Sequence, residues 1–143
     1  FNNSTFAPVT TAQATITPKF ASSKILVQCN GSASASDPSN EYSWHLKRGS
    51  VWIGGNPNTS TASSATTGAH ASGNSGGGPE AATTQSFNHL DSPNTTSAIT
   101  YILGFQGGES QTYSINRGNS TATNNYQFYH SGGCTITLME IAG

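Results

Sequence analysis

The sequence predicts an all-β fold, a sandwich of antiparallel sheets built as one domain over residues 1–143. Three observations lead to this prediction. β-Branched and aromatic residues alternate with polar residues over short windows, clusters of Gly, Pro, Asn and Asp separate these windows, and helix signals are almost absent. A chain of 143 residues is long enough to bury one core, so a second domain is not expected.

Nine windows have the composition of a strand. They are 11–17, 24–32, 42–47, 50–53, 83–89, 99–105, 112–116, 125–130 and 135–141. In the third window Tyr42, Trp44 and Leu46 alternate with polar residues at positions 43, 45 and 47, which predicts a strand buried on one face only. Glycines lie in two predicted turns, 47–50 and 106–109, where they accept the positive φ that reverses a chain. The windows therefore join as antiparallel neighbours.

The long polar segment 54–82 interrupts this pattern. Apart from His70 and Glu80 it contains only small, polar or turn-forming residues, so it cannot fill a core. Structureless connections of this length are uncommon inside compact domains. We expect a disordered segment, a loop over the surface or a segment held by a neighbouring subunit, and a surface or intersubunit loop is the preferred interpretation.

The composition predicts a neutral surface rich in hydroxyl and amide groups. Ser, Thr, Asn and Gly make up 69 of the 143 residues, whereas charged residues make up only 8%. Such a surface suits assembly, extracellular durability or contact with carbohydrate. Five Lys and Arg against six Asp and Glu leave no basic patch for nucleic acid or anionic lipid, and no apolar run reaches the ~18 residues of a membrane span. Neither nucleic acid nor a membrane is an expected partner.

Catalysis is not expected. Residues 73–77 (GNSGG) resemble the nucleophile motif of chymotrypsin-like serine proteases, with Asn in place of Asp. They lie in low-complexity sequence, however, without the rigid strands that a histidine base and an oxyanion hole require. The six carboxylates are scattered along the chain, so no pair is singled out for glycoside hydrolysis.

No metal site and no cofactor are expected either. The four histidines have none of the spacings typical of metal ligands; they are His45, His70, His89 and His130. His130 is a weak candidate, because one histidine per chain can meet its copies at the three-fold axis of a trimer.

The two cysteines, Cys29 and Cys134, are expected to be free thiols that act as small buried hydrophobes. A single disulfide between them is the alternative, since connectivity cannot be read from sequence. Six N-x-S/T sequons are only a mild excess over chance in a chain this rich in Ser and Thr, so glycosylation is not inferred.

Exposed aromatic rings are the remaining candidates for binding, because they can stack on sugar rings. Most tryptophans and tyrosines are expected in the core, since large aromatic side chains are mostly buried. The candidate binding residues are Trp52, His70, Trp44 and Tyr129. Trp52 is the first choice for a test of exposure, because it lies beside the long polar segment.

Three segments follow one another in an order that is not expected from composition alone. They are 23–27 (SKILV), 90–101 (LDSPNTTSAITY) and 135–143 (TITLMEIAG). Together they resemble a small β-domain of structural and fibre proteins of marine and cyanobacterial tailed phages, and the resemblance spans most of the chain. Each segment has a physical use: Pro93 stiffens a turn that starts at Asp91, and Ile136, Leu138 and Ile141 are expected to close the core as the last strand.

The resemblance implies a jelly-roll-like sandwich, a homotrimer and a place on the virion surface, after synthesis in the cytoplasm of the bacterial host. That reducing compartment favours free cysteines. As a fibre or receptor-binding domain the chain would hold a host surface polysaccharide or protein through many weak contacts, and it would meet other virion proteins through its N-terminal side. A capsid decoration protein and a secreted carbohydrate-binding module are the alternatives. Because the first residue is Phe1 and not Met, we expect a longer native chain.

Overall fold

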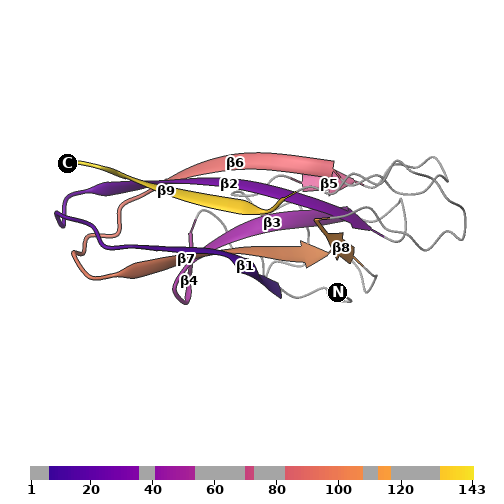
Figure 1. Ribbon diagram of the computed structural model, residues 1–143, viewed down its shortest axis with the longest axis horizontal. Coiled ribbons are helices and arrows are strands. Elements are labelled where there is room, and N and C mark those ends of the chain that lie inside the picture. Colours follow the sequence, from indigo (N-terminus) through magenta and orange to yellow (C-terminus); the bar gives the residue numbers. More distant parts are fainter. Residues whose placement is uncertain (1–6, 36–40, 54–69, 73–82, 108–112, 117–132) are drawn as a thin grey trace, which may run out of the picture.

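The computed structural model describes residues 7–35, 41–53, 70–72, 83–107, 113–116 and 133–143. These residues form nine β-strands in two antiparallel sheets (Figure 1), which confirms the predicted all-β fold. The strands are β1 (Ala7–Ile16), β2 (Lys24–Ala35), β3 (Glu41–Arg48), β4 (Val51–Trp52), β5 (His70–Ser72), β6 (Thr83–Asp91), β7 (Ile99–Gly107), β8 (Tyr113–Ile115) and β9 (Thr135–Ile141). None of the described residues belongs to a helix that is long and apolar enough to cross a membrane.

The first sheet has the strand order β1-β7-β3-β4, and β5 also pairs with β3. β3 and β4 form a hairpin in which Arg48 is opposite Val51. Between them Gly49 has a φ of 57°, a conformation that glycine adopts without strain. The backbone amide of Gly49 donates a 2.8 Å hydrogen bond to the carbonyl of Thr100, which ties the turn to β7. The turn predicted at 47–50 is therefore confirmed.

The second sheet is built around β2. One edge of β2 pairs with β6. The other edge pairs first with β9, over Lys24–Asn30, and then with β8, over Ala33–Ala35, so that β9 and β8 lie end to end. The chain passes repeatedly from one sheet to the other, for example between β1 and β2, β2 and β3, and β6 and β7. Strands that are consecutive in sequence therefore often lie in facing sheets.

The core lies between the two sheets. At its centre the indole of Trp44 is completely buried and meets the ring of Phe105 edge-on, with 5.2 Å between the ring centroids. On the opposite sheet the same indole packs directly on the backbone of Gly31. Phe105 also contacts Tyr113 of β8, with centroids 5.1 Å apart. Aromatic rings of both sheets thus pack together, which confirms the expected core position of most aromatic side chains among the described residues.

A polar cluster joins the two sheets where β6 ends. Asp91, the last residue of β6, accepts hydrogen bonds from Nη1 of Arg48 on β3 at 2.9 and 3.0 Å and from the hydroxyl of Tyr101 on β7 at 2.7 Å. Asp91 and Tyr101 are buried, and Arg48 is half-buried. Burial, together with the hydrogen bond to Asp91, raises the pKa of Tyr101 above its ordinary value, so its hydroxyl remains a donor. We call these three residues the inter-sheet clamp.

Eight of the nine predicted strand windows coincide with observed strands; the window 125–130 lies outside the described residues. β5 was not predicted. It lies inside the segment 54–82 that was expected to be structureless, and it pairs with β3 from Glu41 to Ser43. The rest of that segment from residue 54 onward lies outside the described residues.

The expectation that β3 is buried on one face only is wrong. Trp44 points into the core as predicted, but Ser43 and His45 on the other face are also buried, at 3% and 1% exposure. Oγ of Ser43 and Nε2 of His45 are 2.8 Å apart, so these two buried polar atoms share a hydrogen bond. The ring of His45 also packs edge-on against Trp52, 5.9 Å between centroids.

The predicted role of Ile141 in the core is also wrong. Ile136 and Leu138 are half-buried and pack against the core as expected, whereas Ile141 is 42% exposed. Successive side chains of a strand point to opposite faces. Ile141 is an odd number of residues away from the other two, so it points outward.

Both cysteines are free thiols, as predicted. In the pairing of β2 with β9, Cys29 is opposite Ile136 and therefore diagonal to Cys134. Diagonal neighbours in a sheet are about 7–8 Å apart, which is too far for a disulfide without movement of the backbone. Burial raises the pKa of the Cys29 thiol to about 12.

Candidate functional site

The outer face of the second sheet is a regular and nearly uncharged surface built by three strands. We call it the amide face. It consists of the side chains at alternate positions of β6, β2 and β9, namely Thr84, Ser86, Asn88, Leu90, Lys24, Leu26, Gln28, Asn30, Thr135, Thr137, Met139 and Ile141. The intervening positions of β2 point the other way, since Ile25, Val27 and Cys29 are buried in the core. The two-residue period of the strands therefore creates this face.

The register aligns the side chains of the amide face in rows across the three strands. In one row Asn30 lies between Ser86 and Thr135. The hydroxyl of Ser86 donates to Oδ1 of Asn30 at 2.5 Å, and Nδ2 of Asn30 donates to Oγ1 of Thr135 at 3.0 Å. These three side chains hold one another in place, so this row is a pre-ordered part of the surface.

The adjacent row has the same chemistry but no internal hydrogen bonds. Gln28 lies between Asn88 and Thr137, and all three side chains are exposed. Within the described part of the chain, none of the three side chains has a hydrogen-bond partner. A side-chain amide carries two donor hydrogens and two acceptor lone pairs, and a hydroxyl carries both functions as well. This row can therefore donate to and accept from a binding partner.

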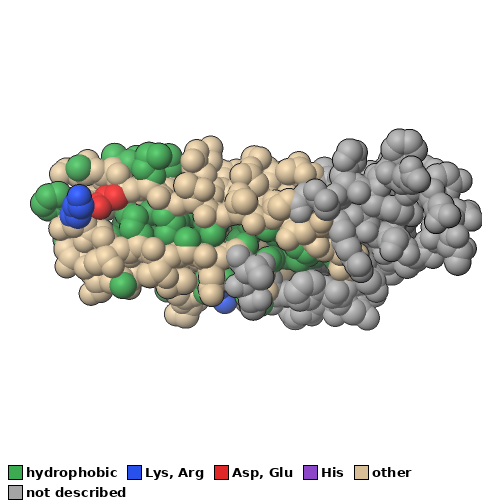
Figure 2. Space-filling model, viewed as in Figure 1, with side chains coloured by type: hydrophobic (Ala, Val, Ile, Leu, Met, Phe, Trp, Pro, Cys, Tyr) green, Lys and Arg blue, Asp and Glu red, His purple; other side chains and the backbone are tan. Residues whose placement is uncertain are grey.

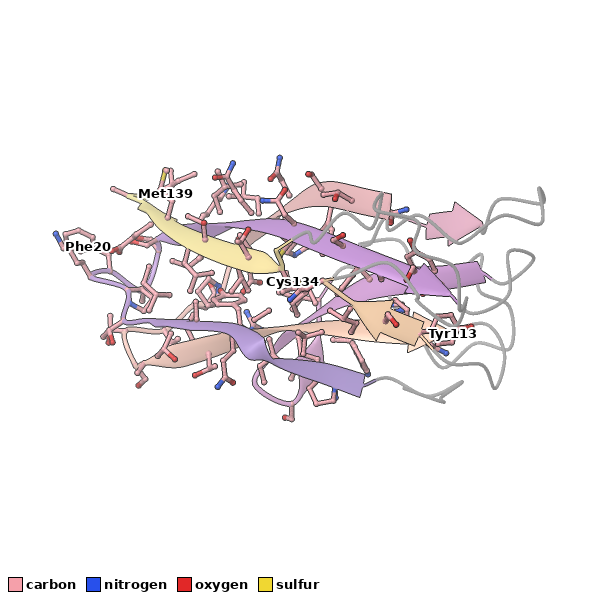
Figure 3. All side chains as sticks on the ribbon, turned by 45° about the vertical axis from the view of Figure 1, so that its right-hand side comes forward. Phe20, Tyr113, Cys134 and Met139 are labelled. Carbon is pink, nitrogen blue, oxygen red and sulfur yellow. The ribbon has the colours of Figure 1, made fainter. Side chains whose placement is uncertain are left out.

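The third row is apolar. Leu26 lies between Leu90 and Met139, which are 49% and 52% exposed. Ile141 follows along β9, and the exposed ring of Phe20 lies in the connection between β1 and β2. Figure 2 shows hydrophobic side chains gathered at the end of the molecule where β2 begins and β9 ends. In Figure 3 Met139 and Phe20 lie at that end, far from Tyr113. Exposed apolar side chains that cluster in this way are candidates for a contact surface.

Charge is nearly absent from the amide face. Lys24, in its last row, is the one charged side chain of the face as defined above. Glu140 belongs to the other phase of β9, and its carboxylate accepts a 2.7 Å hydrogen bond from the backbone amide of Lys19. That carboxylate is therefore used within the chain. A partner of the amide face would meet amides, hydroxyls and aliphatic groups.

The structure places Trp44 and Trp52, two of the sequence-predicted binding residues, on the first sheet and away from the amide face. Trp44 is completely buried in the core, so its indole has no accessible face and the position does not fit a binding role. His70 begins β5, where it pairs with Ser43. Tyr129 and His130 lie outside the described residues. Trp52 on β4 is half-buried, and its binding role stays a prediction.

Trp52 is part of a small cluster on the outer side of the first sheet. Nζ of Lys47 lies 4.2 Å from the centroid of the indole, which is a cation–π contact, and His45 meets the indole edge-on. Burial lowers the pKa of His45 to about 4, so its ring is neutral at pH 7. Lys47 therefore supplies the positive charge beside the indole.

Comparison of this chain with protein-family models, with curated proteins and with solved structures finds no match. Among the described residues there is also no group of three or more His, Cys, Asp or Glu that could hold a metal ion.

Sequence reasoning did not single out the residues of the amide face. Gln28, Asn88 and Thr137 come from three separate windows, and only the register of the sheet places them in one row. One signal was available in the sequence. Leu26 and Leu90 occupy the outward phase of windows whose other phase supplies the core, and an apolar residue at an outward position suggests a contact.

Proposed function

We propose that this chain is a non-enzymatic domain on the surface of a tailed-phage virion, where it serves in several copies as a fibre or receptor-binding domain. The observation that carries the proposal is the position of the three segments that resemble phage β-domains. They pack side by side at one end of the molecule: Lys24 of the first segment is opposite Ile141 of the third, and Ile25 is opposite both Asp91 and Glu140. Segments that resemble a family in sequence thus also form one structural unit.

The surface of the chain supports a contact function. The amide face offers neutral hydrogen-bonding groups next to an exposed apolar row, and Trp52 offers a partly accessible indole on the other sheet. Contacts of this kind are individually weak. They give firm attachment when several copies engage one surface, because each further contact becomes intramolecular.

We further infer a jelly-roll-like sandwich and a homotrimer for this domain. The repeated passage of the chain between the two sheets is the kind of connection that double-sheet jelly rolls use. A closed homo-oligomer is the usual state of a protein that works in several copies.

Binding of the purified chain to an array of bacterial surface polysaccharides tests the function. We expect saturable binding that falls roughly fivefold in Trp52→Ala, since loss of one aromatic contact costs about 1 kcal/mol. Val51→Ala, in the adjacent exposed position, is the matched control and should bind normally. In parallel, antibodies against the chain should label intact virions assembled from the genome that encodes it.

The alternatives give different results. Antibody labelling confined to the capsid shell, without polysaccharide binding, would favour a capsid decoration protein. Strong polysaccharide binding by a strictly monomeric chain that labels no virion would favour a secreted carbohydrate-binding module. Both results would contradict the proposed function.

A further inference from the structure

The geometry points to a second copy of this chain as the occupant of the amide face, with the rows of Gln28 and Leu26 at the centre of the contact. This inference rests on the proposed function, which places several copies of the domain on one virion. It names a two-fold contact between copies that belong to neighbouring trimers, separate from the contacts inside a trimer. The described part of the face is three strands wide, and its Gln28 and Leu26 rows carry exposed side chains on both flanking strands.

The chemistry of the Gln28 row is self-complementary. In a two-fold contact the same patch of both copies meets, so the hydrogen-bond donors of that patch must find acceptors in an identical patch. The amides of Gln28 and Asn88 and the hydroxyl of Thr137 both donate and accept, and none of them is engaged by another described residue. Two identical rows can therefore form hydrogen bonds with each other without a partner of different chemistry.

The absence of charge favours an identical partner. Two copies of a charged face repel each other, and like charges brought together across an interface cost several kcal/mol. The rows of Asn30, Gln28 and Leu26 carry no charged side chain, so two copies meet without this cost. Lys24 lies at the end of the face, where it can stay in water.

The apolar row favours a protein over a sugar as the occupant. Leu90 and Met139 leave about half of their surface in water and flank Leu26, so a facing sheet could bury a continuous aliphatic strip. Stacking on sugar rings uses aromatic faces, and the three rows contain none. Two β-sheets pack face to face at about 10 Å with interdigitated side chains, which this combination of polar and aliphatic rows allows.

The size of the face sets the expected strength. It provides about a dozen described side chains, against about 20–30 per partner at an interface of standard size. Association through this face alone should therefore be weak and visible only at high micromolar concentration. In a fibre, where neighbouring copies are held together, a weak contact of this kind is sufficient.

Sedimentation equilibrium of the purified chain over about 1–500 μM tests the inference. The wild-type chain should associate reversibly. Gln28→Glu changes one exposed amide into a carboxylate of the same shape, and it should weaken association about 10- to 100-fold at pH 7.5 because the copies now repel each other. At about pH 4, near the pKa of a glutamic acid, Gln28→Glu should associate like wild type measured at the same pH. Val51→Glu is the control: Val51 is 53% exposed but lies on β4 of the first sheet, so the variant should associate like wild type.

Mixing two variants identifies the partner as a second copy. Gln28→Glu and Gln28→Lys should each associate about 10- to 100-fold more weakly than wild type at pH 7.5, whereas their equimolar mixture should associate at least as strongly as wild type. Circular dichroism and the unfolding midpoint of each variant show that the fold is retained, as expected for an exposed position.

Three results would overturn the inference. They are a wild-type chain whose mass does not rise with concentration over the whole range, equal weakening by Val51→Glu and Gln28→Glu, and a mixture that associates no better than its components. Polysaccharide binding is measured separately. A chain that associates through this face but binds no polysaccharide and labels no virion would contradict the proposed function and support the self-contact.

Discussion

Gly31 is a residue at which the core allows no larger side chain. A Cβ atom at this position would lie 2.6 Å from Cδ2 and Cζ2 of the indole of Trp44, and the indole is completely buried with no room to move away. Gly31→Ala should therefore destabilise the fold by about 2–3 kcal/mol through overpacking.

Urea unfolding of Gly31→Ala and Gly133→Ala checks this expectation. Gly133 is a matched control, because no atom lies within 4 Å of an added Cβ there. The control should unfold like wild type. Equal midpoints for the two variants would show that Trp44 does not rest on Gly31.

His45 makes stability depend on pH. Its pKa is about 4 in the folded chain, against about 6.5 for an ordinary histidine, because burial disfavours the charged ring. Between these pH values His45 binds a proton in the unfolded chain but not in the folded chain, which favours unfolding. The fold is therefore fully stable with respect to His45 above about pH 6.5 and loses stability as the pH falls toward 4. The total loss should be about 3 kcal/mol.

Urea midpoints of wild type and His45→Gln at pH 7, 5.5 and 4.5 isolate this contribution, since the other titrating groups are common to both chains. The wild type should lose more stability than the variant. An NMR titration that shows the imidazole of His45 protonating near pH 6.5 in the folded chain would contradict the assignment.

At the scale of whole elements, the inter-sheet clamp fixes β6 to β3 and β7. Asp91→Asn keeps the shape of the side chain but removes the charge that holds Arg48 and Tyr101. We expect a loss of about 2–4 kcal/mol, because a half-buried guanidinium and a buried hydroxyl lose their partner. Tyr101→Phe removes one hydrogen bond only and should cost about 1 kcal/mol.

Guanidinium unfolding of both variants at pH 7 measures these losses. The decisive comparison is between the losses in the free energy of unfolding of the two variants. If Asp91→Asn loses no more stability than Tyr101→Phe, the ion pair with Arg48 does not stabilise the packing of the two sheets.

Most strands were predictable because their signals are local. The alternation in β3 and the β-branched runs in β2, β7 and β9 are visible in short windows of sequence. β5 was missed because His70, Ala71 and Ser72 have weak strand propensity, and only pairing with β3 makes them a strand. Ile141 was expected in the core because it is hydrophobic. Its odd spacing from Ile136 and Leu138 along the strand places it on the outer face instead.

The candidate site was less predictable than the fold. Trp44 was considered for binding because it is aromatic, and its position opposite Gly31 could not be known without the contact between the sheets. Gln28 carries no local signal at all. Its significance comes from its neighbours Asn88 and Thr137, which the register supplies from distant parts of the chain.

At the scale of the whole molecule, the domain has one end that combines the segments of the phage resemblance with the apolar row. β2 begins there, β6 and β9 end there (Figure 1), and Phe20 and Met139 are exposed there (Figure 3). Leu90, which is also exposed, flanks Leu26 on the side opposite Met139. A neutral chain with an exposed apolar row is poorly protected from association by charge. The unusual composition is therefore suited to self-association through the amide face.

The methyl group of Met139 tests this claim most directly, because it is the only methionine of the chain and lies in the apolar row. A sample labelled at the methionine methyl gives one NMR signal. Diluting it from about 500 to 10 μM should shift that signal with the same midpoint that sedimentation gives for association. A signal that stays constant while the chain associates would place the contact elsewhere and contradict the account.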